Sequence, residues 1–228
     1  MRLVVFGAGG AVGVRAVAEA VRRGHEVVAV ERSWDGPVDN DLIRQTTADV
    51  LADPLEEIVD GADAVLSCLG VSNDLLTLLD PPPLYTRGTS RICDAMTARG
   101  VRRLLVVSAS FVAAKDRGPL HFRLPAMPAL SRIFDQMAEM EAMLARRDDI
   151  DWTAVRPGWL LDAEATGDYV VQADVIPEDM IRTRTGDLGH FMVELAERGD
   201  WLRGTPAIAR KEPDEASDLS AVLQEVLS

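Results

Sequence analysis

The chain of 228 residues is long enough to bury the core of one α/β domain and too short for two domains of ordinary size. Its composition, 47% hydrophobic and 27% charged, is typical of a soluble globular protein. The formal net charge of −13 disfavours binding to phosphate backbones and anionic membrane surfaces, so we expect neither nucleic acid nor a membrane as a partner.

The two cysteines, Cys68 and Cys93, lack the spacing of a metal site and lie in apolar or helical surroundings. We interpret them as buried thiols in a reducing cytosol. The sequence starts with a strand pattern rather than the basic and apolar regions of a secretory signal, and no apolar run approaches the length of a membrane span. We therefore expect a cytoplasmic protein.

The strongest pattern lies in the first thirty-two residues. Residues 2–6 (RLVVF) and 26–30 (EVVAV) are apolar runs typical of strands, and a glycine-rich turn at 7–13 leads from the first into a helix. The apolar face of this helix is expected to carry Val14, Val17, Ala18 and Val21. Strand, turn, helix and strand in this order predict a βαβ unit with a right-handed crossover.

The turn GAGGAVG predicts a site for the pyrophosphate of a dinucleotide. We expect Gly7 to allow the tight turn, Gly9 or Gly10 to let the backbone approach the phosphates, and Gly13 to let the helix pack closely on the sheet. The free N–H groups of the helix N-terminus would face the phosphates. The predicted pyrophosphate site comprises Gly7, Gly9, Gly10, Ala11, Val12 and Gly13. The alternative is a turn that only connects strand and helix.

The end of the second strand predicts which dinucleotide binds. A carboxylate there usually contacts the ribose hydroxyls of NAD, whereas an arginine accommodates the extra phosphate of NADP, and this chain offers both Glu31 and Arg32. We expect Glu31 to point away from the site, which favours NADP and leaves NAD as the alternative. Asp49 and Val50 follow the third strand and are expected to contact adenine, although Asp49 could instead only cap a loop.

The rest of the chain alternates strands with helices. The expected elements are a strand at 42–47, a short helix at 54–59 capped by Asp53, a strand at 63–69, a helix at 85–99, a strand at 103–107, a long helix at 129–147, strands at 152–155 and 169–172, a helix at 187–198 capped by Asp187, and a terminal helix at 215–227. This alternation predicts a single doubly wound parallel sheet of Rossmann type over residues 1–228, with ligands at the carboxyl ends of the strands.

Residues that follow the central strands are the candidates for the reaction itself. Leu69 and Gly70 could let backbone approach the cofactor, and Ser108 and Ser110 would place hydroxyls near the nicotinamide and the substrate. The alternative for both serines is a turn or capping role. Arg156 lies near the end of another strand, where it could also serve only in a structural ion pair.

The chain lacks the Tyr-x-x-x-Lys pair in which short-chain dehydrogenases use a tyrosine as general acid. Neither Tyr85 nor Tyr169 has a lysine four residues later, and the corresponding positions look like Ile133 and Met137. Catalysis should therefore depend mainly on positioning the hydride donor against the acceptor.

The three histidines receive different interpretations. His121 lies in the segment 112–128, which is expected to be irregular and to overhang the site, so it is a candidate proton donor. His25 is expected at the surface, and His190 is expected to pack or form hydrogen bonds within its helix.

Several motifs together resemble one family. They are GAGGAVG at 7–13, Arg32, Asp49-Val50, DAVLSCLGVSND at 63–74, Ser108 to Phe111, RPGWLLD at 156–162, TGDYVV at 166–171 and DLGHFM at 187–192. With them, nearly the whole chain resembles the atypical short-chain dehydrogenase/reductases of the NAD(P)H-binding, NmrA-like group, and within it the branch of biliverdin and flavin reductases.

The resemblance implies binding of NADPH and hydride transfer to a flat conjugated acceptor, such as a flavin, a tetrapyrrole or a quinone. It implies a substrate pocket shaped by the segments 112–128 and 162–212 and lined by Phe111, Arg156, Pro157, Gly158 and Trp159. Trp159 stands where this branch carries a histidine, and residues 116–128 diverge from it, so the shape of the substrate is open.

We therefore expect an NADPH-dependent reductase of a small molecule that acts as a monomer or homodimer without a metal. Two other functions remain open on the same fold: a redox sensor that binds NADP(H) without turnover, and an epimerase, dehydratase or isomerase of a biosynthetic pathway.

Overall fold

The fold is built around one eight-stranded sheet. The computed structural model describes residues 1–71, 77, 80–114 and 120–213. Within these residues the strands follow the order β3-β2-β1-β4-β5-β6-β10-β8. All neighbouring strands pair in parallel except β10 and β8, which are antiparallel. The predicted doubly wound, mostly parallel sheet is therefore confirmed.

The strands of the main sheet are β1 (Arg2–Phe6), β2 (Glu26–Glu31), β3 (Ile43–Thr47), β4 (Ala64–Ser67), β5 (Arg103–Val107), β6 (Asp151–Pro157), β8 (Val170–Ala173) and β10 (Pro206–Ala209). A separate parallel pair is formed by β7 (Trp159–Leu161) and β9 (Arg182–Arg184). The helices are α1 (Ala11–Arg22), α2 (Glu56–Val59), α4 (Thr89–Ala98), α5 (Leu120–Ala145) and α6 (Thr185–Arg198), with a π-helical turn η1 (Leu84–Gly88) before α4 and a 3₁₀ turn η2 (Ser110–Val112) after β5.

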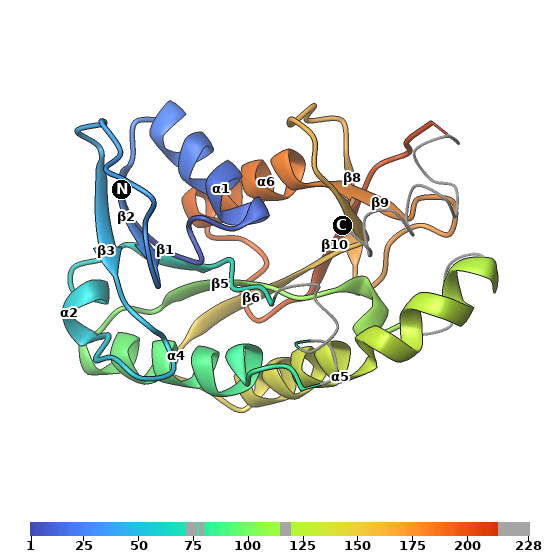
Figure 1. Cartoon of the computed structure of the whole chain (residues 1–228), viewed down its shortest axis with the longest axis horizontal. Coiled ribbons are helices and arrows are strands. Elements are labelled where there is room, and N and C mark those ends of the chain that lie inside the picture. The colour runs from blue at the N-terminus through green and yellow to red at the C-terminus, as the bar shows by residue number, and fades with distance from the viewer. Residues whose placement is uncertain (72–76, 78–79, 115–119, 214–228) are drawn as a thin grey trace.

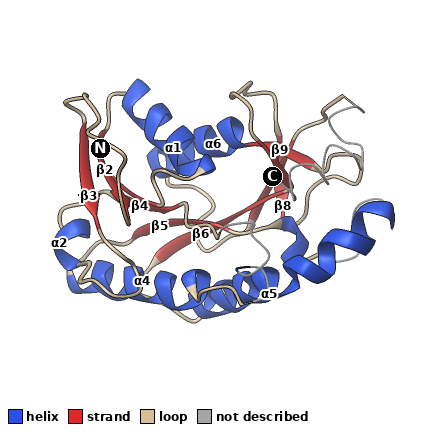
Figure 2. Ribbon diagram, viewed as in Figure 1, coloured by secondary structure: helices blue, strands red, loops and turns tan. Residues whose placement is uncertain are grey.

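Helices cover both faces of the sheet (Figures 1 and 2). The helices α1 and α6 lie on one face, and α2, α4 and α5 lie on the other. Each face has its own apolar core, because the central strands are buried on both sides. Continuous apolar strands of this kind are what a parallel sheet between two helical layers requires.

The buried face of α1 differs from the predicted one. The residues with little exposure are Val12, Gly13, Ala16 and Ala20, whereas Val14 is half exposed. The reason is the close packing of α1 against α6: a Cβ on Gly189 of α6 would lie only 2.8 Å from the backbone nitrogen of Ala16. Small residues are needed at this contact. Of the predicted residues, Val17 and Val21 pack partly buried against the same core, whereas Val14 and Ala18 are exposed, so the predicted face is right only in part.

Several predicted boundaries also shift. The helix α5 begins at Leu120, within the segment expected to be irregular, and continues through Pro125 and Pro128. The helix α2 begins at Glu56 without a side-chain cap, and α6 begins two residues before its predicted cap, Asp187. The helix expected at 215–227 lies outside the described residues.

The buried polar groups of α6 bind backbone rather than solvent. The carboxylate of Asp187 accepts hydrogen bonds from the N–H groups of Thr166 and Gly167 at 2.7 and 3.0 Å, which anchors the loop that precedes β8.

His25, expected at the surface, is buried and lies 2.8 Å from Glu197 of α6. His190 lies 2.8 Å from the hydroxyl of Tyr169, in agreement with its expected hydrogen-bonding role.

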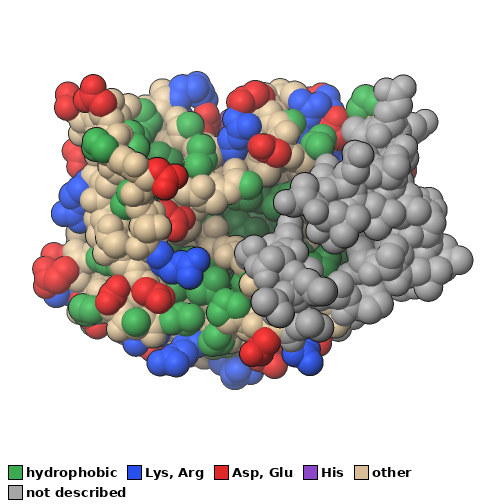
Figure 3. All heavy atoms as spheres, in the orientation of Figure 1, with side chains coloured by type: hydrophobic (Ala, Val, Ile, Leu, Met, Phe, Trp, Pro, Cys, Tyr) green, Lys and Arg blue, Asp and Glu red, His purple; other side chains and the backbone are tan. Residues whose placement is uncertain are grey.

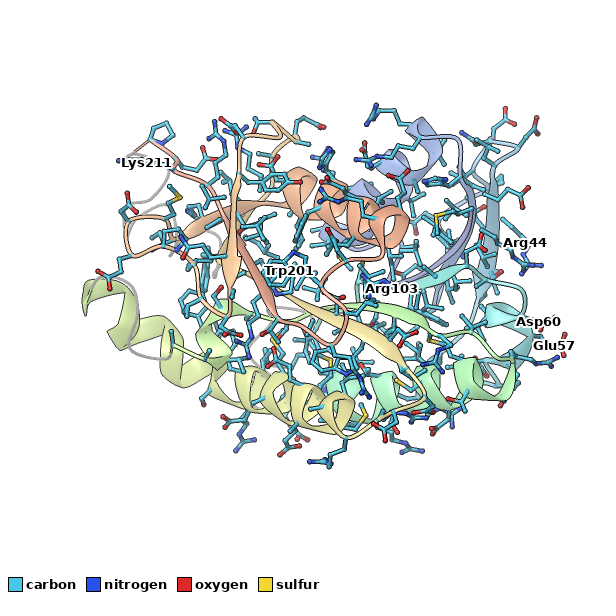
Figure 4. The ribbon with its side chains drawn as sticks, turned by 180° about the vertical axis from the view of Figure 1, so that it is seen from behind. Arg44, Glu57, Asp60, Arg103, Trp201 and Lys211 are labelled. Atoms are coloured by element: carbon cyan, nitrogen blue, oxygen red, sulfur yellow. The ribbon has the colours of Figure 1, made fainter. Side chains whose placement is uncertain are left out.

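A buried arginine holds the opposite end of the sheet together. Arg103, at the start of β5, donates to the carbonyl oxygens of Asp151, Leu195 and Asp200, and burial lowers its pKa to about 10. In the view of Figure 4, Arg103 and Trp201 lie below α6 in the middle of the molecule, whereas Arg44 and Glu57 lie at its edge. This cluster secures the scaffold at the end away from the site.

Candidate functional site

A cavity of about 610 Å³ lies at the carboxyl ends of the strands. Residues at or just after the ends of six strands line it: Phe6, Glu31, Ala48, Cys68, Val107 and Pro157. Figure 3 shows a hollow on this face with hydrophobic side chains at its floor. Ligands of open α/β sheets bind at this edge.

The glycine turn forms one wall of the cavity and depends on its glycines. Gly7 has a φ of +73°, and a Cβ on it would lie 2.6 Å from the carbonyl oxygen of Cys68. A Cβ on Gly13 would lie 1.9 Å from the carbonyl oxygen of Gly7. These two glycines therefore let the turn fit tightly between α1 and β4, as the sequence predicts.

The N-terminus of α1 is open toward the cavity. Its cap residue, Gly10, has no side chain that could accept a hydrogen bond from the first N–H groups of the helix. The first turn of α1 also carries no acidic residue. Gly10, Ala11 and Val12 line the cavity, and a Cβ on Gly10 would meet only the carbonyl oxygen of Gly7, at 3.4 Å. Backbone N–H groups without a side-chain acceptor at a helix N-terminus fit a phosphate.

Glu31 points into the site rather than away from it, contrary to our expectation. Its carboxylate accepts the N–H of Gly9 at 2.9 Å and the N–H of Arg32 at 3.2 Å. Arg32 is exposed and lines the same cavity, and no carboxylate of the described residues pairs with its guanidinium. The end of β2 thus presents a carboxylate already bonded to backbone and an arginine available to a ligand.

Of the two residues predicted to contact adenine, only one lines the cavity. Val50 lines the cavity, but Asp49 does not, because its carboxylate accepts the N–H of Leu51 at 2.8 Å and so caps the turn after β3. Arg91 fixes this turn by donating to the carbonyl oxygen of Val50. A Cβ on Gly88 would lie 3.2 Å from Val50, so helix η1 packs closely against the turn. The predicted residues Leu69 and Gly70 line the cavity as well.

The other end of the cavity is aromatic and apolar. The rings of Phe111 and Phe134 have centroids 5.6 Å apart, and the rings of Phe111 and Trp159 meet nearly edge to face at 6.4 Å. Ile133 and Met137, which the sequence analysis compared with the positions of a Tyr-x-x-x-Lys pair, line the cavity too. Together they provide a surface suited to a flat ring.

A buried polar network lies behind this wall. Ser108 is 1% exposed and its hydroxyl donates to Glu141 Oε1 at 2.6 Å. Arg156 binds the same carboxylate through Nε at 3.0 Å and Nη2 at 2.5 Å. Arg156 is therefore held in an ion pair, which is the alternative role that the sequence analysis left open for it. It is not among the residues that line the cavity.

Of the remaining residues predicted for the site, some line the cavity and others do not. The hydroxyl of Ser110 donates to the carbonyl oxygen of Arg156 at 2.9 Å, and Ser110 does not line the cavity. Pro157 and Gly158 do line it, and a Cβ on Gly158 would lie 2.5 Å from the carbonyl oxygen of Ile181. His121 belongs to the first turn of α5, and its side chain lies outside the described part of the structure.

The turn η1 contributes to the site although it was not predicted to, and the segment 162–212, predicted to shape the pocket, contributes at its start and near β9. Tyr85 and Leu84 line the cavity from η1, and Asp162 and Thr185 line it from the segments after β7 and β9. The sequence gives no local pattern for Tyr85, because a π-helical turn shifts its register relative to an α-helix. In the described residues, no group of histidines, cysteines and carboxylates could hold a metal ion, and no helix has the length and hydropathy of a membrane span.

Comparisons with known proteins agree with this geometry. A 3-diazoavenalumate denitrifying reductase of Streptomyces is 31% identical over 172 residues, which are 65% of this chain and 53% of that protein. An uncharacterized chloroplastic protein of Arabidopsis thaliana is 28% identical over 189 residues, or 79% of this chain and 65% of its own length. The chain thus spans between about half and two thirds of these curated relatives.

Solved structures share the fold. A protein from Streptococcus pneumoniae proposed to be an NADH-flavin reductase superposes with a TM-score of 0.75 at 23% identity, covering 92% of this chain and 100% of that one. An oxidoreductase from Lactococcus lactis gives 0.76 at 18% identity, covering 100% and 98%. A protein from Bacteroides thetaiotaomicron proposed to be an epimerase gives 0.76 at 24%, covering 93% and 98%.

A family model described as NAD(P)H-binding matches residues 7–198, from the first glycine of the turn to the end of α6. This match takes in most of the chain and every residue that lines the cavity except Phe6. The chain therefore belongs to the NAD(P)H-binding family.

Proposed function

We propose that this protein is a reductase that uses NADPH to reduce a small, flat, conjugated acceptor. The observation that carries the proposal is the cavity itself, which joins an open helix N-terminus at one end to the aromatic wall of Phe111, Phe134 and Trp159 at the other. The Streptomyces relative, named as a reductase, supports the same class of reaction.

The residues fit a dinucleotide along the strand ends. The N–H groups at the start of α1 would hold the pyrophosphate, Val50 and Leu69 would flank the adenine, and the guanidinium of Arg32 would bind the 2′-phosphate of NADPH. The hydrogen bonds that Glu31 accepts from Gly9 and Arg32 hold its carboxylate in place and partly balance its charge. We therefore retain NADPH over NADH as the preferred cofactor.

A bound reduced nicotinamide supplies the hydride. The chain's part is to hold an acceptor flat against that ring and to keep water away, which the apolar side chains of Ile133, Met137 and Trp159 are placed to do. We propose that the whole chain forms one domain, that residues 112–128 and 162–212 complete the acceptor pocket, and that the protein works in the cytoplasm.

The test is oxidation of NADPH, followed by its absorbance, with FMN, FAD, biliverdin and a panel of quinones as acceptors. Binding of NADPH is measured by fluorescence in the same preparation. We expect binding and turnover with at least one conjugated acceptor. Tight binding without turnover of any acceptor would instead favour a redox sensor, and absence of binding would contradict the proposal.

A further inference from the structure

Few groups in the cavity can donate a hydrogen bond to an acceptor molecule. Ser108 is the polar side chain predicted for this role, but its hydrogen is directed to Glu141, which as the ion-pair partner of Arg156 can only accept. The oxygen of Ser108 is left with lone pairs, so it can accept a hydrogen bond from a ligand without donating one. The donor must be sought elsewhere.

Tyr85 lies in the cavity wall on the side of α4 and α5. Its side chain is 6% exposed, and its ring packs within the same apolar core as Phe111, Phe134 and Met137. It is held in η1, which packs closely against the turn after β3, since a Cβ on Gly88 would lie 3.2 Å from Val50. A ring packed in this way keeps its hydroxyl in one place, which a positioned donor requires.

Within the described residues, the hydroxyl of Tyr85 has one partner, which leaves its hydrogen for a ligand. The backbone N–H of Val71 donates to its oxygen, and no group of the described residues accepts its hydrogen. Val71, which lies beyond the end of β4, also lines the cavity. Burial raises the pKa of Tyr85 to about 12, so the hydroxyl keeps its proton at neutral pH. A buried hydroxyl with an unused hydrogen is costly unless a ligand accepts it.

We propose that Tyr85 is the catalytic hydrogen-bond donor of the cavity and that it binds a carbonyl oxygen of a quinone-like acceptor. This inference rests on the reductase function proposed above and assigns the acceptor class. Addition of hydride to a quinone leaves one negative charge on the oxygen conjugated to the attacked carbon. Tyr85 donates its hydrogen bond to that oxygen without losing its proton, and water then protonates the oxygen. The hydrogen added to carbon leaves as a proton to water while the other carbonyl oxygen takes up a proton, and this tautomerisation gives the hydroquinone.

The test compares Tyr85→Phe with Tyr169→Phe. Both replacements remove one tyrosine hydroxyl, but Tyr169 is only partly buried, its hydroxyl contacts His190 and Glu194 of α6, and it does not line the cavity. Calorimetry without cofactor measures the affinity of each variant for menadione and for methylnaphthalene, which has the same ring system without the carbonyl oxygens. Turnover of menadione with NADPH is measured in parallel, after thermal melting has established that both variants fold.

Tyr85→Phe should weaken menadione binding about 3- to 10-fold and leave methylnaphthalene binding unchanged, because one hydrogen bond to oxygen is lost. It should lower kcat by a larger factor than it raises KM, and Tyr169→Phe should change neither. Equal menadione affinity in wild type and Tyr85→Phe, or equal weakening of both ligands, would overturn the role of Tyr85. If the wild-type protein binds menadione but none of the tested acceptors supports oxidation of NADPH, the reductase proposal fails. The comparison of menadione binding between wild type and Tyr85→Phe still tests the role of Tyr85.

Discussion

Glu31 and Gly9 are joined by a hydrogen bond of 2.9 Å from the N–H of Gly9 to Glu31 Oε1, which ties the end of β2 to the glycine turn at one end of the cavity. The contact is close, because a Cβ on Gly9 would lie 3.2 Å from Glu31 Cγ. The carboxylate is thus part of the glycine turn's structure, while the adjacent Arg32 remains available. Cofactor preference should depend on the balance between these two charges.

Replacement of Arg32 by alanine should therefore weaken NADPH binding about 10- to 100-fold and leave NADH binding nearly unchanged, since only NADPH carries the 2′-phosphate. Glu31→Gln should strengthen NADPH binding, because the amide oxygen can still accept the N–H of Gly9 while the charge is removed. Fluorescence titration with both cofactors measures this. Arg44→Ala is the matched control, as Arg44 lies at the periphery on β3. Equal weakening of both cofactors by Arg32→Ala would contradict the assignment.

The glycine turn offers a second prediction, in which two alanine substitutions have opposite consequences. Gly13→Ala places a Cβ 1.9 Å from the carbonyl oxygen of Gly7, so α1 must move and the melting temperature should fall by several degrees. Gly10→Ala meets the same oxygen at only 3.4 Å and should leave the fold intact while weakening binding of the dinucleotide. Thermal melting and NADPH titration of both variants separate these effects, and a stable Gly13→Ala protein would contradict the packing argument.

The sequence predicts the first βαβ unit well because its signals are local. Strand, glycine turn and second strand each depend on neighbouring residues, and the structure places both strands within a residue of the predicted bounds. The helix α1 begins at Ala11, inside the predicted turn. The buried face of α1 is different, since it is decided by the close approach of Gly189, which lies far along the chain. Hydrophobicity predicts the partly buried Val17 and Val21, but it does not predict that the fully buried positions are Ala16 and Ala20.

The polar residues of the site were harder to predict for the same reason. Glu141 lies 33 positions from Ser108 and 15 from Arg156, so no local pattern reveals that the three side chains meet. The start of α5 was missed because Pro125 and Pro128 usually mark irregular structure. The inward orientation of Glu31 depends on a bond to the glycine turn rather than on strand alternation.

The pair of Glu141 and Arg156 leads to a third prediction. Both side chains are about 10% exposed, so Glu141→Leu leaves a buried guanidinium without its partner and should lower the free energy of unfolding by about 3–5 kcal/mol. The double variant with Arg156→Met replaces the ion pair by apolar groups and should recover most of that loss. Urea denaturation measures both. A double variant as unstable as the single one would show that the backbone contacts of Arg156, such as its bond to the carbonyl of Asp174, matter more than the pair.

The ion pairs in the last turn of α1 give a last prediction, which concerns pH. Hydrogen bonds from Arg22, opposed by desolvation and reinforced by Arg23, lower the pKa of Glu19 to about 2 from 4.5. A carboxylate whose pKa is lower in the folded state stabilises the protein fully above the unfolded value, and this stabilisation is lost as the pH falls from about 4.5 toward 2. Glu19→Gln should therefore be less stable than wild type at neutral pH, on the order of 1 kcal/mol, and the difference should shrink below pH 4.5. Denaturation across this range, with Glu26→Gln as an exposed control, measures the effect, and a pH-independent difference would mean that Glu19 acts through packing and not through its charge.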